Sequence, residues 1–253
     1  MKSRIISILM ILICFAIPAF SAINPDEIVL IWTFDEGEGQ EVFDLSGKEH
    51  TGEIMGNAGW TDDGKFGKAI EFSGGHVLTS HAEDMNLETF SFTAWIKVPD
   101  VLNPYQMVMG KESWPSRNYS MWLLPDKVNV GITEPDDKQL QSADVVVDGE
   151  WHHVGGAYDK ENLTVYVDGK ISTQVGPLNS DPLLCETGFM VGAQPPAGGG
   201  PLHGIIDEVS VFNVGMDVDD IESIMENGLT QFAFAVSSDG KLSVTWGSLK
   251  DIK

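Results

Sequence analysis

The chain has few cysteines, few basic residues and no long apolar run, and each shortage excludes a class of protein. It has 15 Lys and Arg against 38 Asp and Glu, a balance that repels nucleic acid and anionic lipid. Its N-terminal apolar run, residues 5–17, is shorter than the roughly 18 to 20 residues that span a bilayer. No later stretch is apolar enough to span one. We therefore expect no nucleic-acid partner and no membrane insertion of the mature chain.

Residues 1–21 have the order of a secretory signal peptide. The basic start MKSR leads into the apolar run, and the small residues Ser21 and Ala22 follow it. Cleavage there removes Cys14 and leaves only Cys185, so no intramolecular disulfide can form. It also moves the formal charge from −23 to −25. We predict a secreted or cell-surface protein whose fold depends on core packing.

Short β-rich runs separated by Gly, Asp and Asn extend from about residue 28 to residue 212, with no helical periodicity among them. In residues 90–98, FSFTAWIKV, apolar side chains alternate as in a strand with one buried face. Asp168-Gly169 separates two further runs and favours a tight hairpin turn. The pattern predicts an all-β, two-sheet antiparallel jelly-roll sandwich over residues 22–230.

The C-terminal part breaks this pattern. Asp217 is placed to cap a short helix, and Gly228 is placed to end it. Beyond the helix, residues 231–253 contain an apolar alternation, an SSDG turn and a second alternation. We expect a terminal β-hairpin or appended segment there.

Five segments, in this order, resemble the laminin G-like (LamG) domains of the concanavalin A-like superfamily. They are IWTFDEGEGQEVFDLSGKEHTGEI, GKFGKAIEFSGG, FSFTAWIKV, DGEWHHVGGAYDKENLTVYVDGK and GIIDEVSVFNVGMDVDDI. The resemblance implies a jelly roll that recognises glycans or proteins, and a calcium ion is common in the family. The matching acidic positions are Asp35, Asp44 and Asp207. Calcium takes six to eight oxygen ligands, so two or three carboxylates with backbone carbonyls can hold it. Aspartates are scattered throughout this acidic chain, and Asp44, before Ser46-Gly47, can equally cap a turn.

A sugar site needs aromatic faces and polar groups for hydroxyls. The segment GKESWPSRNYSMW supplies Trp114, Arg117, Asn118 and Tyr119, and we assign these as candidate ligand-binding residues. Most tryptophans and tyrosines lie in apparent strands, where packing in the core is the simpler explanation.

The superfamily also contains β-glucanases that use an ExDxxE strand, and this chain has no such motif. We therefore predict a secreted, non-catalytic recognition or adhesion module for a glycan or a surface protein. Two alternatives stay open. One is a divergent glycoside hydrolase using Glu134 or Asp207, and the other is a structural component of a surface layer.

Overall fold

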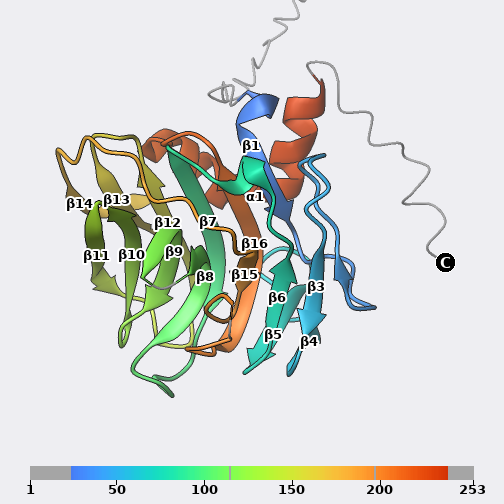
Figure 1. Cartoon of the computed structure of the whole chain (residues 1–253). Helices are drawn as coiled ribbons and strands as arrows, with labels where there is room; N and C mark the ends of the chain where they lie inside the picture. The colour runs from blue at the N-terminus through green and yellow to red at the C-terminus, as the bar shows by residue number, and fades with distance from the viewer. Residues whose placement is uncertain (1–23, 114, 197, 239–253) are drawn as a thin grey trace, which may run out of the picture.

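The computed structural model describes residues 24–113, 115–196 and 198–238, with side chains up to residue 230. These residues form two eight-stranded sheets in which every paired strand is antiparallel. The sheets pack face to face with one C-terminal helix (Figure 1). This confirms the predicted two-sheet jelly-roll sandwich. The predicted leader, residues 1–21, lies outside the described residues.

Sheet A contains the strand closest to the N-terminus and the last strand of the chain. Its order is β14 (Lys170–Val175), β13 (Leu163–Val167), β12 (Trp151–Tyr158), β7 (Phe90–Lys97), β16 (His203–Phe212), β5 (Ala69–Ser73) and β4 (Ala58–Thr61), with β1 (Ile28–Trp32) paired to β16. The turn between β13 and β14 is formed by Asp168 and Gly169, with φ of 50° and 74°, as the sequence predicts.

Sheet B faces sheet A across the core. Its order is β11 (Asp136–Val145), β10 (Lys127–Glu134), β9 (Ser116–Leu123), β8 (Gln106–Ser113), β15 (Phe189–Val191), β6 (His76–Thr79), β3 (Gly52–Met55) and β2 (Glu41–Val42). Two 3-10 turns, η1 (Pro25–Glu27) and η2 (Glu83–Met85), complete the elements before β7.

The core lies between the two sheets and follows the predicted alternation. Phe90, Phe92, Ala94, Ile96 and Val98 all belong to one buried apolar cluster. Burial of such side chains contributes roughly 1.5 to 3 kcal/mol each, so this single face is a main source of stability. The side chains between them are also largely buried, because the outer face of sheet A is covered as well.

Helix α1 (Val218–Ser238) provides that cover. The Asp217 carboxylate accepts hydrogen bonds from the backbone N–H groups of Asp219 and Asp220, at 3.0 and 3.1 Å, and so caps the helix start. Ile221 and Ile224 pack into a second apolar cluster against the outer face of sheet A. The other fully buried members of this cluster are Ile28, Ile31, Ala157, Tyr166, Phe212, Met216 and Leu229.

The helix is longer than the sequence suggests. Gly228, with φ of 72° and ψ of 161°, ends the first helical stretch as predicted, but the chain re-enters a helix after this kink. The predicted strand at the start of residues 231–253 is therefore wrong for residues 231–238. An alternation of six residues cannot by itself separate strand from helix, and the alanines and glutamine there are good helix formers. Residues 239–253 lie outside the described residues.

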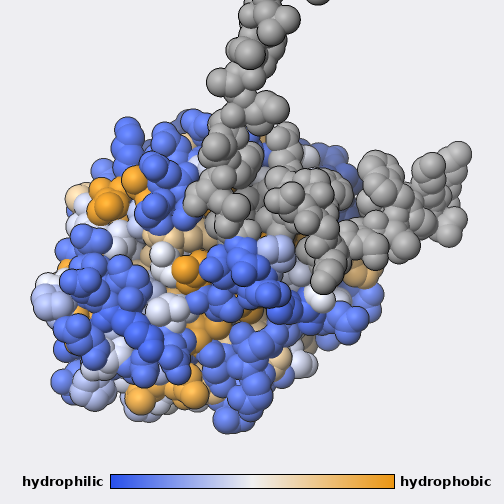
Figure 2. Space-filling view, turned by 90° about the horizontal axis from the view of Figure 1, so that it is seen from above, coloured by the Kyte–Doolittle hydropathy of each residue, from blue (hydrophilic) through white to orange (hydrophobic). Residues whose placement is uncertain are grey.

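The described residues contain no helix that is long and apolar enough to cross a membrane. Seen from above, the surface is mostly hydrophilic and carries only small separate hydrophobic patches (Figure 2). This surface agrees with the excess of acidic residues in the chain.

Candidate functional site

The two sheets differ in what covers their outer faces. Helix α1 packs on the outer face of sheet A, through the second apolar cluster. On sheet B, Tyr119, Met121 and Leu123 of β9 point into the main core, so the alternate residues Ser120 and Trp122 face outward. No described helix covers the outer face of sheet B, but neighbouring side chains leave Ser120 fully buried and Trp122 only 2% exposed.

A stack of three side chains lies on this outer face. The ring centroids of Tyr105 and Trp122 are 6.2 Å apart, and the guanidinium carbon of Arg117 is 4.8 Å from the Trp122 ring. Glu112 and Gln194 lie beside the stack. We refer to these five residues as the Trp122 face. Burial, followed by the nearby Glu112 carboxylate, raises the pKa of the Tyr105 hydroxyl, so this group remains a protonated donor.

An ion network fixes the polar side of the Trp122 face. Arg117 Nε donates to Glu112 Oε2 at 2.8 Å, and Arg117 Nη1 donates to Asp137 of β11. Gln194 donates its amide to the other oxygen of Glu112. Glu112 is fully buried, so the carboxylate depends on these partners in place of water. Ser120 adds a buried hydroxyl for which no hydrogen-bond partner is present among the described residues.

The structure places the predicted ligand-binding residues in different environments. Arg117 lies on the Trp122 face, and Trp114 lies outside the described residues. Tyr119 is fully buried among Phe90, Phe92 and Phe189. Asn118 is fully buried and binds the backbone N–H and carbonyl of Leu87. Tyr119 points into the main core and the Asn118 amide is bound to the Leu87 backbone, so neither belongs to the Trp122 face.

Sequence reasoning missed Glu112 and Trp122, and the register explains why. The β8–β9 ladder shifts between Lys111 and Glu112, so Glu112 pairs with Arg117 whereas Lys111 pairs with Tyr119. This irregularity changes which residues of the segment face outward. The tryptophan was visible in the sequence, but its side of the sheet was not.

A second cluster of polar groups lies on the opposite sheet, around Asp207. Its Oδ2 accepts hydrogen bonds from the backbone N–H groups of Lys65 and Phe66, at 2.8 and 2.9 Å. Burial raises the pKa of Asp207 to about 7 and that of Glu208 to about 8, and the neighbouring Asp35 carboxylate adds to both shifts. Asp35 itself is exposed and accepts a hydrogen bond from Lys68 N. Predicted calcium ligands Asp35 and Asp207 are thus neighbours.

A bulge brings Asp207 and Glu208 to the same side. Adjacent strand residues normally point to opposite faces, which is what the sequence suggests for this pair. However, the β16–β7 register shifts between Asp207 and Ser210, and Glu208 has φ of 53°. Ile206 and Val209 consequently both point into the main core, and the two acidic residues between them contact elements outside sheet A. The two carboxyl groups therefore do not follow the strict alternation of a regular strand.

Asp44, the third predicted calcium ligand, serves its own turn. Its Oδ1 accepts hydrogen bonds from the backbone N–H groups of Ile31 and Ser46, and its Oδ2 accepts from His50 N and Ser46 Oγ. These four bonds are the turn-forming role that the sequence left open. Among the described residues, the carboxylate oxygens of Asp35, Asp44 and Asp207 do not all come within 4.8 Å of one another.

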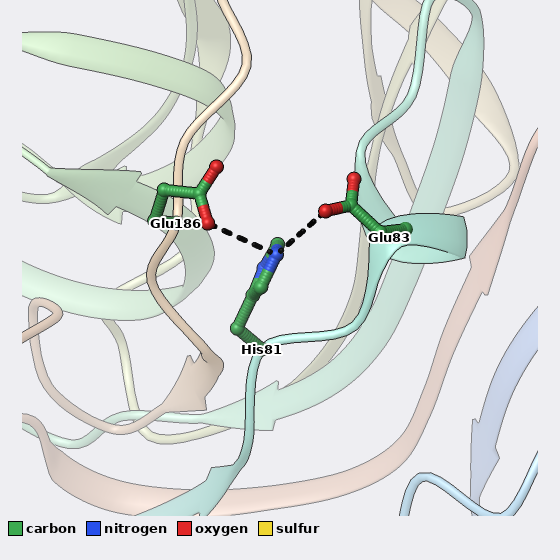
Figure 3. Close-up of side chains that lie close together, drawn as sticks. All are labelled: His81, Glu83 and Glu186. Atoms are coloured by element: carbon green, nitrogen blue, oxygen red, sulfur yellow. Dashed lines mark ion pairs between the residues drawn. The ribbon is translucent and has the colours of Figure 1, made fainter.

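Among the described residues, three metal-ligating side chains come within 4.8 Å of one another at one place. They are His81, Glu83 and Glu186. His81 points between the two glutamates, which come from separate loops (Figure 3). No sequence motif connects these residues, because Glu186 is distant in the chain from the other two.

A hollow of about 380 Å³ lies at the edge of the sandwich beside β3 and β4. Its wall is formed mostly by glycine, alanine and aliphatic residues, and Glu53 is the single charged residue in it. Specific recognition usually needs several converging polar groups, so this hollow is a weaker candidate than the Trp122 face.

No curated protein matches the chain. Several solved binding domains are similar to it in structure. For the binding domain of Paraclostridial Mosquitocidal Protein 1, the TM-score is 0.66 at 12% identity, over 79% of this chain and 52% of that one. For the binding domain of botulinum neurotoxin DC in complex with rat synaptotagmin II, it is 0.62 at 15% identity, over 79% and 51%. This chain thus spans about half the length of these toxin domains.

A third similar structure is matched over nearly its whole length. It is domain 4 of AbnA, a GH43 extracellular arabinanase from Geobacillus stearothermophilus, in complex with arabinotriose. The TM-score is 0.62 at 17% identity, over 79% of this chain and 98% of that one. Identities this low show the fold alone. The family model of the concanavalin A-like lectin/glucanases superfamily, of laminin G type, matches residues 72–222, more than half of the chain. The chain therefore belongs to the laminin G-like domains of the concanavalin A-like lectin/glucanase superfamily.

Proposed function

We propose that this protein is a secreted, non-catalytic module that binds a glycan through the Trp122 face. The observation that carries the proposal is the stack of Tyr105, Trp122 and Arg117 beside the carboxylate of Glu112 and the amide of Gln194. Sugar rings pack on aromatic side chains, and their hydroxyls bind amide, carboxylate and guanidinium groups. Tyr105 and Gln194 are half-buried and are the members that a ligand can reach first, since Trp122, Arg117 and Glu112 are at most 5% exposed.

The charge of the chain favours an uncharged glycan. Loss of residues 1–21 would leave a formal charge of −25, and Glu112 and Asp137 place carboxylates on the binding side itself. An anionic sugar would meet repulsion there. The arabinanase domain supports this choice, because that protein was solved with the neutral sugar arabinotriose and has nearly the same extent as this fold.

The arrangement of carboxylates argues against the hydrolase alternative. A retaining pair needs two carboxyl groups about 5 Å apart, one of them free to act as an acid. Glu112 and Asp137 are instead bound by the same Arg117 guanidinium. Of the two residues suggested by sequence, Glu134 is buried in sheet B beside the hydroxyl of Tyr158, whereas Asp207 belongs to sheet A. They form no catalytic pair.

A structural calcium at Asp35 and Asp207 belongs to the same proposal. Within the described part of the chain, the buried Asp207 and Glu208 carboxyls accept hydrogen bonds from backbone N–H groups alone, and their pKa values are raised to about 7 and about 8. A bound cation would neutralise this group, and carboxylate oxygens are the donors that calcium prefers. The ion would fasten the loop around Lys65 and Phe66 to β16.

The proposed function is tested by measuring glycan binding and glycan hydrolysis with the same protein. The chain lacking residues 1–21 is applied to an array of neutral and anionic glycans, and the polysaccharides it binds are then incubated with it and assayed for reducing ends. We expect binding to neutral glycans and no release of reducing ends. Release of reducing ends that is lost in Glu112→Gln would establish the hydrolase alternative. Binding confined to sialylated or sulfated glycans would contradict the proposed ligand class.

A further inference from the structure

The cluster of His81, Glu83 and Glu186 shares no residue with either site described above. His81 follows β6, Glu83 begins the 3-10 turn η2, and Glu186 precedes β15. Strands β6 and β15 are antiparallel neighbours, with Thr79 opposite Phe189. This pairing brings the two loops together at one end of sheet B, where the three side chains converge (Figure 3).

His81 forms ion pairs with both glutamates, at distances that also suit the ligands of one metal ion. His81 Nε2 lies 3.6 Å from Glu83 Oε1 and 3.5 Å from Glu186 Oε2. Both exceed the 2.7 to 3.2 Å of an ordinary hydrogen bond, and Nε2 is buried with no hydrogen-bond partner among the described residues. Ligands about 2.1 Å from a tetrahedral metal are separated by roughly 3.4 Å, which is close to the observed spacing.

Lys111 holds the histidine ring from its other side. Its Nζ lies 3.0 Å from His81 Nδ1 and donates to the backbone carbonyls of Cys185 and Thr187. These contacts fix the orientation of the imidazole, with Nε2 directed at the two glutamates. The Lys111 ammonium donates to Nδ1 in the metal-free chain, so the ring hydrogen lies on Nε2, and a metal that binds Nε2 must displace that hydrogen.

We propose that His81, Glu83 and Glu186 form a binding site for a zinc-type divalent transition metal. One imidazole nitrogen and two carboxylates are a ligand set that zinc accepts, whereas calcium prefers six to eight oxygens. The two glutamate side chains are 85% and 88% exposed, so the metal can enter from solvent and a fourth position stays open to water or to a ligand. The bound ion joins the η2 loop to the segment before β15.

The experiment measures zinc binding by the metal-free chain lacking residues 1–21. Titration calorimetry with zinc chloride gives the affinity and stoichiometry, and thermal unfolding gives the stabilisation. We expect one zinc ion at this cluster. At free zinc about 100 times the Kd, the Tm should rise by about 5 to 10 °C. His81→Gln, Glu83→Gln and Glu186→Gln should each weaken binding by more than the roughly 10- to 100-fold cost of losing an outer-shell partner.

A matched control comes from a second histidine between two carboxylates. His152 binds Asp168 through Nδ1 at 2.9 Å and Asp148 through Nε2 at 3.3 Å, so its carboxylates engage different ring nitrogens and cannot share one ion with it. His152→Gln should leave zinc binding unchanged. Loss of affinity in the three cluster variants alone supports the proposal.

Two outcomes overturn it. Zinc binding that persists in His81→Gln would mean that the acidic surface binds the metal without this site. An equal response to calcium chloride, abolished by Glu83→Gln, would show an oxygen-ligand site instead. Neither result tests glycan binding by the Trp122 face, so failure of the zinc proposal can be distinguished from failure of the proposed function.

Discussion

The guanidinium carbon of Arg117 lies 4.8 Å from the centroid of the Trp122 ring, while its Nε binds the fully buried carboxylate of Glu112. One side chain thus contacts an aromatic surface and satisfies a buried charge on the outer face of sheet B. Because both contacts depend on Arg117, this residue determines whether the Trp122 face can keep its shape.

Replacement of Arg117 should therefore be costly. Arg117→Met leaves Glu112 buried without its cation, which typically lowers the free energy of unfolding by about 3 to 5 kcal/mol. Urea unfolding followed by tryptophan fluorescence measures the change. Lys160→Met is the control, since Lys160 forms exposed ion pairs with Glu88 and Asp181 and its loss should matter little. Equal stability of the two variants would contradict the structural importance of the buried pair.

The closeness of the two sheets can be tested at Gly156 of β12. A Cβ atom there would lie 2.8 Å from Val130 Cγ2 and 2.9 Å from Phe92 Cζ. Gly156→Ala should lower the free energy of unfolding by about 1 to 3 kcal/mol through overpacking. At Gly59 of β4 a Cβ would meet no atom within 4 Å, so Gly59→Ala should change stability by less than about 0.5 kcal/mol. Chemical denaturation of both variants gives the comparison, and a harmless Gly156→Ala would mean that the sheets are farther apart.

The acidic cluster on sheet A predicts a definite pH dependence. The pKa of Glu208 is raised to about 8, so in the metal-free folded state this group keeps its proton at pH values where the unfolded chain has lost it. Its contribution is complete below about pH 4.5 and is lost as the pH rises through about 8. Between pH 5 and 8, stability of the wild type should fall more steeply than that of Glu208→Gln, whose amide oxygen can still accept from Leu229 N. Parallel profiles would show that Glu208 is ionised throughout.

Calcium should counteract this instability. In calcium chloride the Tm of the wild type should exceed its value in EDTA, because an ion that binds only the folded state stabilises it. Asp35→Asn is the informative variant, since Asp35 is exposed and its replacement should not disturb the core. We expect the calcium-dependent rise to disappear in Asp35→Asn and to persist in Asp44→Asn. A rise that both variants retain would remove calcium from this cluster.

The fold was predictable because its information is repeated along the sequence. The alternation from Phe90 to Val98 identifies a buried face, and the structure places it in one core with Ile206, Val209 and Val211 of β16. Many strands indicate the same two-sheet fold, so a misassigned residue in one strand does not change the predicted fold class. The helix start at Asp217 was also predictable, because the cap needs only hydrogen bonds between Asp217 and the next three residues.

The candidate sites were less predictable, because they depend on irregularities of single residues. The register shift beside Glu112 and the bulge at Glu208 each change which side chains face outward, and neither has a clear signal in the sequence. His81 and Glu186 meet only because β6 pairs with β15. Residue type identified Arg117 and Asp207, but pairing between distant segments decided what surrounds them.

The central claim is that a neutral glycan binds on the Trp122 face. Titration calorimetry with the best glycan from the array tests it in the wild type, in Tyr105→Ala and in Trp60→Ala, a half-buried tryptophan at the far edge of sheet A. Loss of one aromatic contact costs about 0.5 to 1.5 kcal/mol, so Tyr105→Ala should bind about 3- to 10-fold more weakly while Trp60→Ala binds as the wild type does. Unchanged affinity in Tyr105→Ala together with weakened binding in Trp60→Ala would contradict the account and place the ligand at the other edge of the sandwich.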